Sequence, residues 1–127
     1  MHAIVHALSL TGPVKADKSL SSHIDLTILA ALDKQPMHGY ALIAHLREVS
    51  DGLFDFPEGT IYPVLHALEQ KGFVESDWEI GESGRKRRSY SITAAGKTEL
   101  AGKAARWAQF SKAIDRFLRA AKVPKKA

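Results

Sequence analysis

One stretch, residues 57–72 (PEGTIYPVLHALEQKG), constrains what this chain can fold into more than any other. Its apolar residues Ile61, Leu65 and Leu68 recur at helical spacing, so they can form one inward-facing stripe. Gly72 follows the last periodic residue and is typical of a helix C-terminus. The stretch therefore predicts a helix with one buried face, whose other face is left to approach another surface.

A basic hairpin is predicted directly after this helix. Residues 73–80 and 87–93 both alternate in the manner of strands, and the glycine-containing turn GESG lies between them. The first strand has Val74, Ser76, Trp78 and Ile80 on one face, and the second has Arg88, Tyr90 and Ile92 on one face. The second strand opens with the cationic run RKRR.

The net charge of +4 conceals a strong asymmetry along the chain. Residues 1–84 hold 5 basic and 12 acidic side chains, a balance of −7, whereas residues 85–127 hold 13 basic and 2 acidic ones, a balance of +11. A basic half of this kind is typical of a surface that faces a polyanion, most often a nucleic acid. From composition alone, a solvated helix face with a lysine tail explains the charge equally well.

A helix with one polar face, followed by a hairpin with a cationic tip, is the arrangement with which a winged helix-turn-helix binds DNA. On the polar face lie Thr60, Tyr62, Pro63 and His66, which we expect to face DNA. Tyr62 has an alternative role as a half-buried packing residue, and His66 as a plain solvent residue. Pro63 cannot donate a backbone hydrogen bond, which predicts that regular helix begins near Thr60.

The wing carries four adjacent cations, Arg85, Lys86, Arg87 and Arg88. Alternate side chains diverge in an extended segment, so only about half of them can face one DNA surface. We expect Arg85 and Arg87 to reach the minor groove or flanking phosphates, and Lys86 to contribute long-range charge. A solvated cationic turn is the alternative. Glu69 is predicted to pair with an arginine at the base of the wing.

Two helices are predicted before the DNA-facing one. In residues 22–33, Ser22 and Asp25 resemble a capping pair, ahead of an apolar stripe. In residues 38–49, Gly39 falls in the first turn, where another backbone can approach, and Tyr40 is predicted to pack in the core. The core face of this second helix comprises Leu42, Ile43, Leu46 and Val49. Residues 53–56 predict a short edge strand, and residues 1–18 a flexible arm.

The last predicted helix, residues 94–121, begins after Thr93 as N-cap and is long for so small a chain. Its apolar seam and the aromatic residues beside it comprise Leu100, Ala104, Trp107, Phe110, Ile114, Phe117 and Leu118. Soluble monomers avoid exposing so large an apolar face, so we expect a second copy to cover it in a homodimer. The alternative is that the helix folds back on its own core. Residues 122–127 form a basic tail.

Trp107 is the residue of this helix with the most specific potential role. In a dimer, two facing indoles form a flat apolar slot that could hold a small aromatic ligand, with Phe110 and Ile114 as neighbours. The alternative is that Trp107 only cements the interface. Which of the two applies stays open from the sequence.

Several classes of function are disfavoured by what the sequence lacks. There is no cysteine, which excludes disulfides and thiolate metal sites and fits a reducing cytoplasm. His2 and His6 have helical spacing but no third ligand nearby, so we predict no metal site and no cofactor. No catalytic motif such as GxSxG, HExxH or a phosphate loop occurs, and we predict that the protein is not an enzyme. No apolar run is long enough to span a membrane.

Three motifs, in order, resemble the PadR family of bacterial transcriptional regulators. They are the LxILxxLxxxPxHGYxLxxxL pattern in residues 26–46, GTIYPVLHALEQKGFV in residues 59–74 and RRSYSITAAGKTEL in residues 87–100. The single C-terminal helix is similar to that of the short-chain members. The resemblance implies a mostly α fold with a small β-hairpin wing (α+β), divided into a winged helix at residues 19–93 and a dimerisation helix at residues 94–121.

The resemblance further implies a dimeric repressor of double-stranded operator DNA, released by a small aromatic or drug-like ligand. The alternative is a winged-helix protein-interaction module without sequence-specific DNA binding. The RKRR run counts against this alternative, because protein interfaces are depleted of lysine while DNA interfaces are strongly cationic.

Overall fold

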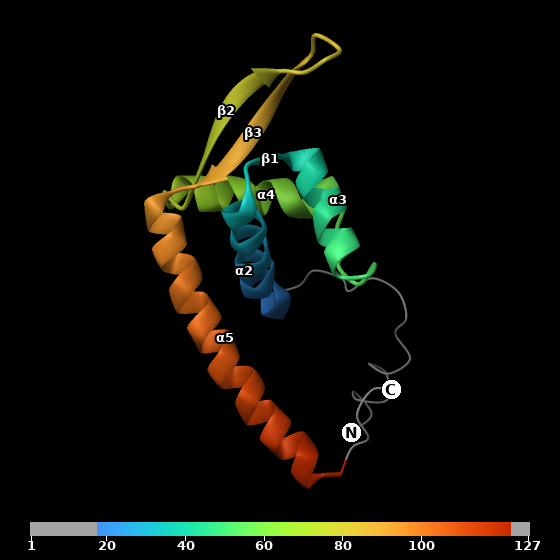
Figure 1. The fold of residues 1–127 in the computed structure, drawn as a ribbon, viewed down its shortest axis with the longest axis vertical. Coiled ribbons are helices and arrows are strands. Elements are labelled where there is room, and N and C mark those ends of the chain that lie inside the picture. The colour runs from blue at the N-terminus through green and yellow to red at the C-terminus, as the bar shows by residue number, and fades with distance from the viewer. Residues whose placement is uncertain (1–17, 123–127) are drawn as a thin grey trace.

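The computed structural model describes the backbone of residues 18–122 and the side chains of residues 23–122. In chain order its elements are α2 (Lys18–Lys34), β1 (Met37–His38), α3 (Gly39–Val49), α4 (Glu58–Gln70), β2 (Val74–Ile80), β3 (Lys86–Ile92) and α5 (Ala94–Ala120). Helices α2, α3 and α4 gather at one end of the hairpin β2–β3, and α5 runs away from them (Figure 1). This is the predicted α+β winged-helix fold.

The sheet is antiparallel with the strand order β1-β3-β2. The hairpin pairs residue by residue from Val74 with Ile92 to Ile80 with Lys86, which confirms both predicted strands to within one residue at each end. The short strand β1 adds to the other edge of β3, where Met37 pairs with Tyr90. The hairpin therefore projects beyond β1 as a two-stranded wing.

The core lies between the three clustered helices and the base of the sheet. Alternation and helical spacing bring one apolar stripe from each element to the centre, as predicted for α4. The fully buried side chains are Ile28, Leu29 and Leu32 of α2, Leu42 of α3, Ile61, Leu65 and Leu68 of α4, and Val74 and Tyr90 of the sheet. Burial of each such side chain contributes about 1.5–3 kcal/mol, which fixes the orientation of α4 beneath the wing.

Helix α2 is longer than predicted. It begins at Lys18, so Ser22 lies inside the helix and the predicted capping pair of Ser22 and Asp25 is wrong. No helix breaker separates residues 18–21 from the apolar stripe, and the helix therefore extends through them. The rest of the predicted arm at 1–18, including His2 and His6, lies outside the described residues.

The predicted edge strand at 53–56 is a loop, and β1 takes its place as the third strand. Within the loop, the rings of Phe54 and Phe56 stack with centroids 5.7 Å apart. The alternation therefore reflects two aromatic side chains packing against the core rather than strand pairing, since Phe56 is buried and Phe54 partly so.

The remaining differences from the predicted structure concern helices α3 and α4. Helix α3 begins at Gly39, and Tyr40 in its first turn is 75% exposed rather than in the core. Val49, its last residue, is also exposed, because the periodic pattern continues past the packed middle of the helix. Helix α4 begins at Glu58, which puts Pro63 in the second turn rather than the first. Its missing bond falls at exposed Gly59, whose carbonyl can bond to water.

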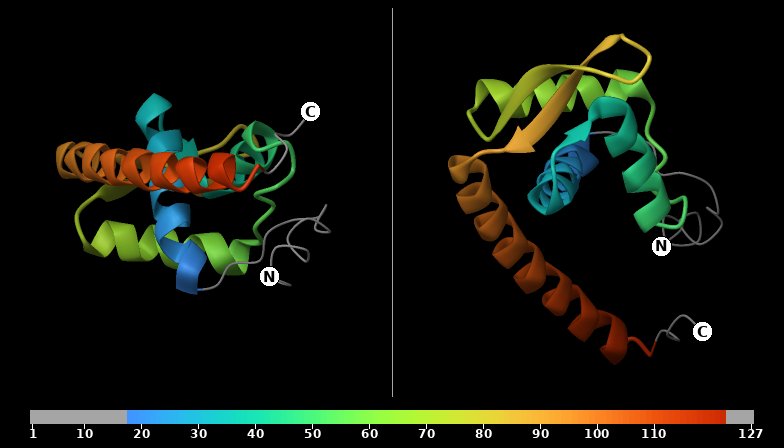
Figure 2. Two further views of the ribbon diagram at one scale, coloured as in Figure 1. Left: turned by 90° about the horizontal axis from the view of Figure 1, so that it is seen from below. Right: turned by 45° about the horizontal axis from the view of Figure 1, so that its top comes forward.

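Helix α5 confirms its predicted bounds and cap. The side chain of Thr93 accepts a hydrogen bond from the backbone N–H of Gly96 at 3.0 Å. Figure 2 shows the helix starting next to the end of β3 and extending past the other helices. Gly96 is its one buried residue in the described part of the chain. None of the described helices is long and apolar enough to cross a membrane.

Candidate nucleic-acid interface and apolar pocket

Helix α4 presents the predicted DNA-facing residues on the side away from the core. Pro63 and His66 are exposed, and Thr60 is half-buried near the N-terminus of the helix. The opposite stripe is fully buried, so packing fixes which face of α4 is offered to solvent. These are small or flat side chains, and a duplex can come close to them.

Tyr62 differs from its three companions because its ring packs inside the fold. A Cβ atom on Gly39 would lie 2.6 Å from carbon atoms of the Tyr62 ring, so glycine at that position is required by this contact. Burial raises the pKa of the Tyr62 hydroxyl, and the nearby Glu58 carboxylate adds to the rise. The close approach expected at Gly39 is therefore made by a side chain rather than a backbone, and Tyr62 carries a packing role whatever else it contacts.

The wing is a regular hairpin with an exposed cationic tip. Its turn closes through hydrogen bonds from Gly81 N–H to the Arg85 carbonyl at 2.8 Å and from Gly84 N–H to the Gly81 carbonyl at 2.9 Å. Gly84 has φ +85°, a left-handed conformation that favours glycine. Arg85, Lys86 and Arg87 are all exposed, as expected for groups that meet a polyanion.

Two side-chain hydrogen bonds anchor the wing to the helices. The Ser76 hydroxyl donates to the Glu69 carboxylate at 2.7 Å, so the predicted partner of Glu69, an arginine, is wrong. His38 Nε2 lies 2.7 Å from Glu79 Oε1, which joins the start of α3 to the outer end of β2. The partner is a serine because Ser76, which pairs with Tyr90, lies closer to the base of the hairpin than Arg88, which is on the same face.

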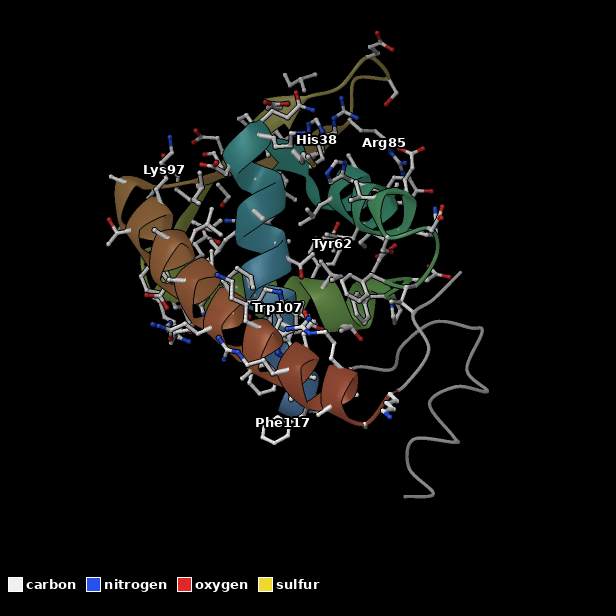
Figure 3. All side chains as sticks on the ribbon, turned by 60° about the horizontal axis from the view of Figure 1, so that its bottom comes forward. His38, Tyr62, Arg85, Lys97, Trp107 and Phe117 are labelled. Atoms are coloured by element: carbon white, nitrogen blue, oxygen red, sulfur yellow. The ribbon has the colours of Figure 1, made fainter. Side chains whose placement is uncertain are left out.

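The wing and α4 thus form one continuous side of the molecule, distant from the outer end of α5. Figure 3 shows His38 and Arg85 at the wing end, Tyr62 between the helices, and Trp107 and Phe117 along α5. Of the predicted residues of the DNA surface, Tyr62 and Arg87 line one hollow, whereas Arg85 and Lys86 lie at the turn of the wing. Those of the ligand or dimer surface, namely Trp107, Phe110, Ile114, Phe117 and Leu118, are all exposed on α5.

An apolar pocket of about 440 Å³ lies where α5 passes α2 and the loop before α4. The rings of Trp107 and His23 pack edge to face with centroids 5.2 Å apart, and the centroid of the Phe110 ring lies 5.9 Å from that of Trp107. The lining comprises His23, Ile24, Leu26, Thr27, Phe54, Phe56 and Trp107. Sequence reasoning identified Trp107 and its neighbour Phe110 but not the other residues that line this pocket, because those come from segments with no periodic relation to α5.

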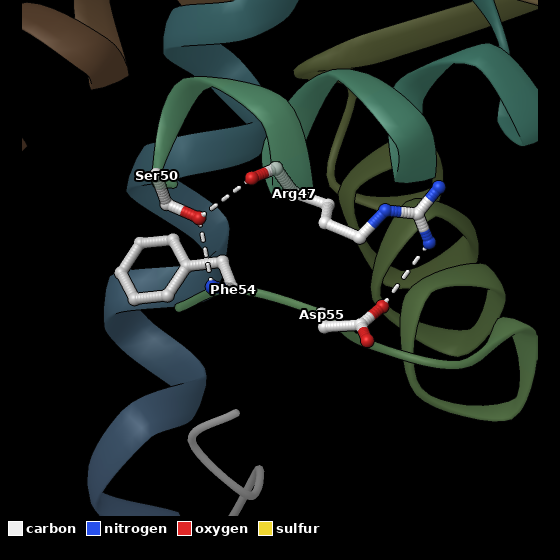
Figure 4. A network of polar contacts seen from close by, with 4 residues as sticks. All are labelled: Arg47, Ser50, Phe54 and Asp55. Atoms are coloured by element: carbon white, nitrogen blue, oxygen red, sulfur yellow. Dashed lines mark hydrogen bonds and ion pairs between the residues drawn. The ribbon is translucent and has the colours of Figure 1, made fainter. Parts of the chain in front are cut away.

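A small polar network holds the loop that lines this pocket (Figure 4). The backbone N–H of Phe54 donates to the Ser50 hydroxyl at 2.8 Å, and that hydroxyl donates to the Arg47 carbonyl at 3.3 Å. The Arg47 guanidinium pairs with Asp55 at 3.2 Å. These contacts fix the path of residues 50–55 and thereby the position of the Phe54 ring at the pocket.

A recognition helix with an exposed face, beside a wing with an exposed basic tip, defines a winged-helix protein of the DNA-binding class. A family model described as "Transcriptional regulator PadR-like family" matches residues 28–102. That match covers the second half of α2, then α3, α4, the wing and the start of α5. The chain therefore belongs to the PadR-like family; it is a DNA-binding transcriptional regulator and not an enzyme.

Similar proteins agree with this assignment. A PadR family transcription regulator of Clostridium difficile is 32% identical, with a TM-score of 0.66 over 76% of this chain and 98% of that one. A transcriptional regulator of Clostridium thermocellum is 27% identical, with a TM-score of 0.72 over 80% and 99%. An uncharacterised protein of Lysinibacillus sphaericus is 29% identical over 78% of this chain and 91% of its own length.

Proposed function

We propose that this protein is a homodimeric transcriptional repressor of the bacterial cytoplasm that a small aromatic ligand releases from its operator. The observation that carries the proposal is the position of Trp107. It stands on the exposed apolar face of α5 and at the same time lines the apolar pocket. One residue thus touches both the surface that a second copy would cover and the space that a ligand would fill.

The DNA surface in this proposal combines α4 with the wing. From α4 it includes Thr60, Tyr62, Pro63 and His66, and the wing contributes its cationic run from Arg85 on, of which only the side chains on one face of the hairpin can rest on a duplex. The exposure of Pro63, His66 and the cationic tip of the wing supports the assignment, because contacts from a helix and a basic hairpin fix the position of a protein on a duplex. Two such surfaces related by a two-fold axis would match a palindromic operator.

Dimerisation is supported by the apolar face of α5. Phe110, Phe117 and Leu118 are exposed at 57%, 75% and 44% on one side of a helix that has little contact with its own core. A second copy of the same helix is the occupant that presents a matching apolar surface. We expect Phe117→Lys to raise the dimer dissociation constant by about tenfold or more, measured by sedimentation equilibrium.

The matched control for this variant is Arg116→Ala. Helical spacing places Arg116 on the opposite side of α5 from Ile114 and Leu118, and Arg116 is exposed. We expect Arg116→Ala to leave the dissociation constant unchanged. A wild-type protein that sediments as a monomer throughout, or a Phe117→Lys variant that dimerises as wild type, contradicts the dimer.

Ligand release is supported by the chemistry of the pocket. Its lining is aromatic and aliphatic apart from His23 and Thr27, and the Thr27 hydroxyl already donates to the His23 carbonyl. A planar apolar molecule would stack on Trp107 and Phe54 and displace the loop or the helix that joins the pocket to the DNA surface.

The test uses fluorescence anisotropy of labelled DNA from upstream of the protein's own gene, with scrambled DNA as control. Tight, salt-sensitive and selective binding is expected, since pairing of cations with phosphates releases counterions. The dye 8-anilinonaphthalene-1-sulfonate then serves as an aromatic probe, and we expect it to weaken DNA binding by wild type but not by Trp107→Ala. Equal, weak binding to both DNAs would instead favour a winged helix that binds protein partners.

A further inference from the structure

Strand alternation sorts the side chains of the wing into two faces. The register pairs Trp78 with Arg88 and Ile80 with Lys86, so these four lie on one face, continuous with buried Tyr90. We call this the inner face of the wing; it comprises Ser76, Trp78, Ile80, Lys86, Arg88 and Tyr90. The outer face comprises Glu75, Asp77, Glu79, Arg87, Ser89 and Ser91.

The two faces differ in charge. All three carboxylates of β2 are on the outer face, where Glu79 stands across from Arg87 and pairs with His38. The inner face has no carboxylate within the two strands and carries two cations, Lys86 and Arg88. A polyanion that approaches the wing is therefore attracted to the inner face and repelled from most of the outer one.

On the inner face, the Arg88 side chain is held in place beside exposed apolar side chains. The guanidinium carbon of Arg88 lies 5.2 Å from the centre of the Trp78 ring, within range of a cation–π interaction. The Nε atom of Arg88 is buried and has no hydrogen-bond partner among the described residues. Trp78 and Ile80 are nevertheless 63% and 74% exposed, so the ring that holds Arg88 in place and the isoleucine beside it face solvent.

This face is continuous with the recognition helix. Arg88 and Tyr90 line one hollow together with Gly39 and Tyr62, and so connect β3 to the first half of α4; Arg87 borders the same hollow. Burial raises the pKa of the Tyr90 hydroxyl, which the neighbouring Arg88 guanidinium partly offsets, in keeping with close packing of the two. A duplex resting on Thr60 and Pro63 of α4 would meet this side of the wing next.

We propose that the inner face of the wing is the surface that lies against the DNA backbone, with Lys86 and Arg88 on phosphates and Trp78 packed on deoxyribose. The proposal rests on the DNA binding proposed above and refines it. It assigns the strand contacts to Lys86 and Arg88, whereas the sequence alone favoured Arg87 over Lys86. Arg85, in the turn, keeps its expected role at the tip.

Arg88→Ala and Arg87→Ala form a matched pair, because the two residues are neighbours of the same type on opposite faces. In the anisotropy assay with the full chain, we expect Arg88→Ala to weaken binding about five- to tenfold and to reduce the salt slope by about 0.9, the value for one phosphate contact. We expect Lys86→Ala to act in the same direction, and Arg87→Ala to change affinity less than about twofold.

Trp78 gives a second, uncharged test. Trp78→Ala is expected to weaken binding with an unchanged salt slope, and Trp78→Phe to restore part of the affinity, because a ring can still pack on sugar. Arg88→Lys keeps the charge without the planar stacking group and should keep the salt slope. Circular dichroism of each variant at the assay temperature shows whether it is folded. If an alanine variant is unfolded, Arg88→Lys and Trp78→Phe provide the test in its place.

Two different results overturn two different statements. Wild-type protein that shows no salt-sensitive, selective binding overturns the proposed function and this assignment together. Wild-type protein that binds, while Arg87→Ala costs as much affinity as Arg88→Ala or more, overturns the assignment of the inner face alone. So does normal binding by both Trp78→Ala and Lys86→Ala.

Discussion

The winged-helix body, residues 18–92, and helix α5 meet at one joint but differ in how their side chains are used. Every buried hydrophobic side chain of the described residues belongs to the body, and of the 27 residues of α5 only Gly96 is buried. The body can hold its shape through its own core, whereas most of the apolar surface of α5 gains nothing from the fold of a single chain. The stability of the body therefore comes from its own core, whereas little of the stability of α5 does.

This difference also divides the functions. The proposed DNA surface lies on the region with the complete core, where rigid packing sets the position of α4 and the base of the wing. The proposed dimer and ligand surface lies on the region without one. A ligand or a second copy can therefore move α5 relative to the body with little disturbance of the packing inside the body.

A cavity in the core of the body should have the largest effect on stability. We expect Leu65→Ala to lower the free energy of unfolding by about 2–5 kcal/mol, because Leu65 is fully buried and its removal leaves a void. Urea unfolding of dilute protein measures the change. The control, Phe117→Ala, removes a side chain that is 75% exposed and is expected to cost less than about 0.5 kcal/mol there. Equal costs would show that α5 belongs to the same core.

The joint gives the next largest effect. A Cβ atom at Gly96 would stand 2.7 Å from Ile92 Cγ1 and closer still to the Phe73 carbonyl oxygen, so Gly96→Ala forces β3 and α5 apart. We expect it to destabilise the protein by about 1–3 kcal/mol despite the better helix propensity of alanine. Thermal unfolding provides the measurement.

Gly102 supplies the matched control on the same helix. A Cβ atom there would meet only Arg106 Nη1, at 3.4 Å, which is the end of a flexible side chain. Gly102→Ala should therefore stabilise α5 by up to about 1 kcal/mol. The same substitution is thus expected to have opposite signs at the joint and beyond it, and equal signs would refute the distinction.

Loss of the N-cap between the two regions should have the third-largest effect on stability. Thr93 accepts from Gly96 N–H at 3.0 Å and donates to the Gly72 carbonyl at 2.6 Å, so one side chain begins α5 and ties it to the turn before the wing. We expect Thr93→Ala to cost about 1 kcal/mol in chemical unfolding. Thr98→Ala, which removes an exposed hydroxyl further along α5, should cost a few tenths of that. A smaller loss at Thr93 than at Thr98 would contradict the cap.

The elements that the sequence predicted well are those whose signals are local. The stripe of Ile61, Leu65 and Leu68, the alternating hairpin and the Thr93 cap all depend on neighbours within one element, and each is found as predicted. The same holds for the exposure of the wing cations, which follows from their charge and their place in a turn.

The features that were missed depend on partners distant in sequence. Residues 53–56 alternate like a strand, but the free edge of β3 is taken by Met37 and His38 instead. Gly39 leaves room for the ring of Tyr62, and no rule of sequence spacing relates the two positions. The apolar pocket likewise joins α2, a loop and α5, so its lining could be known only once the chain had folded.

The contact between α2 and α5 provides the smallest predicted effect. Burial raises the pKa of Asp25 above 3.8, more than the attraction of Lys103 and Lys71 lowers it, and Glu99 adds to the rise. Lys103 and Glu99 belong to α5, so the shift reports that α5 covers this part of α2.

The sign of the pH dependence follows from this shift. The folded state binds the proton of Asp25 more tightly than the unfolded state does, so its contribution to stability falls as pH rises from the unfolded-state pKa through the folded-state pKa. Asparagine cannot titrate, and Asp25→Asn should therefore gain stability relative to wild type across that window and keep the gain at neutral pH. Since the site is partly exposed, we expect less than about 1 kcal/mol.

Urea unfolding of wild type and Asp25→Asn between pH 3 and pH 7 measures this difference directly, because titration of the other carboxylates is common to both proteins. Asp33→Asn, which changes an exposed carboxylate on the same helix, controls for the loss of one negative charge. A difference that grows with pH places α5 against α2 in solution, even though α5 adds almost nothing to the core. A flat difference would mean that α5 stands clear of the body until a second copy or a ligand holds it there.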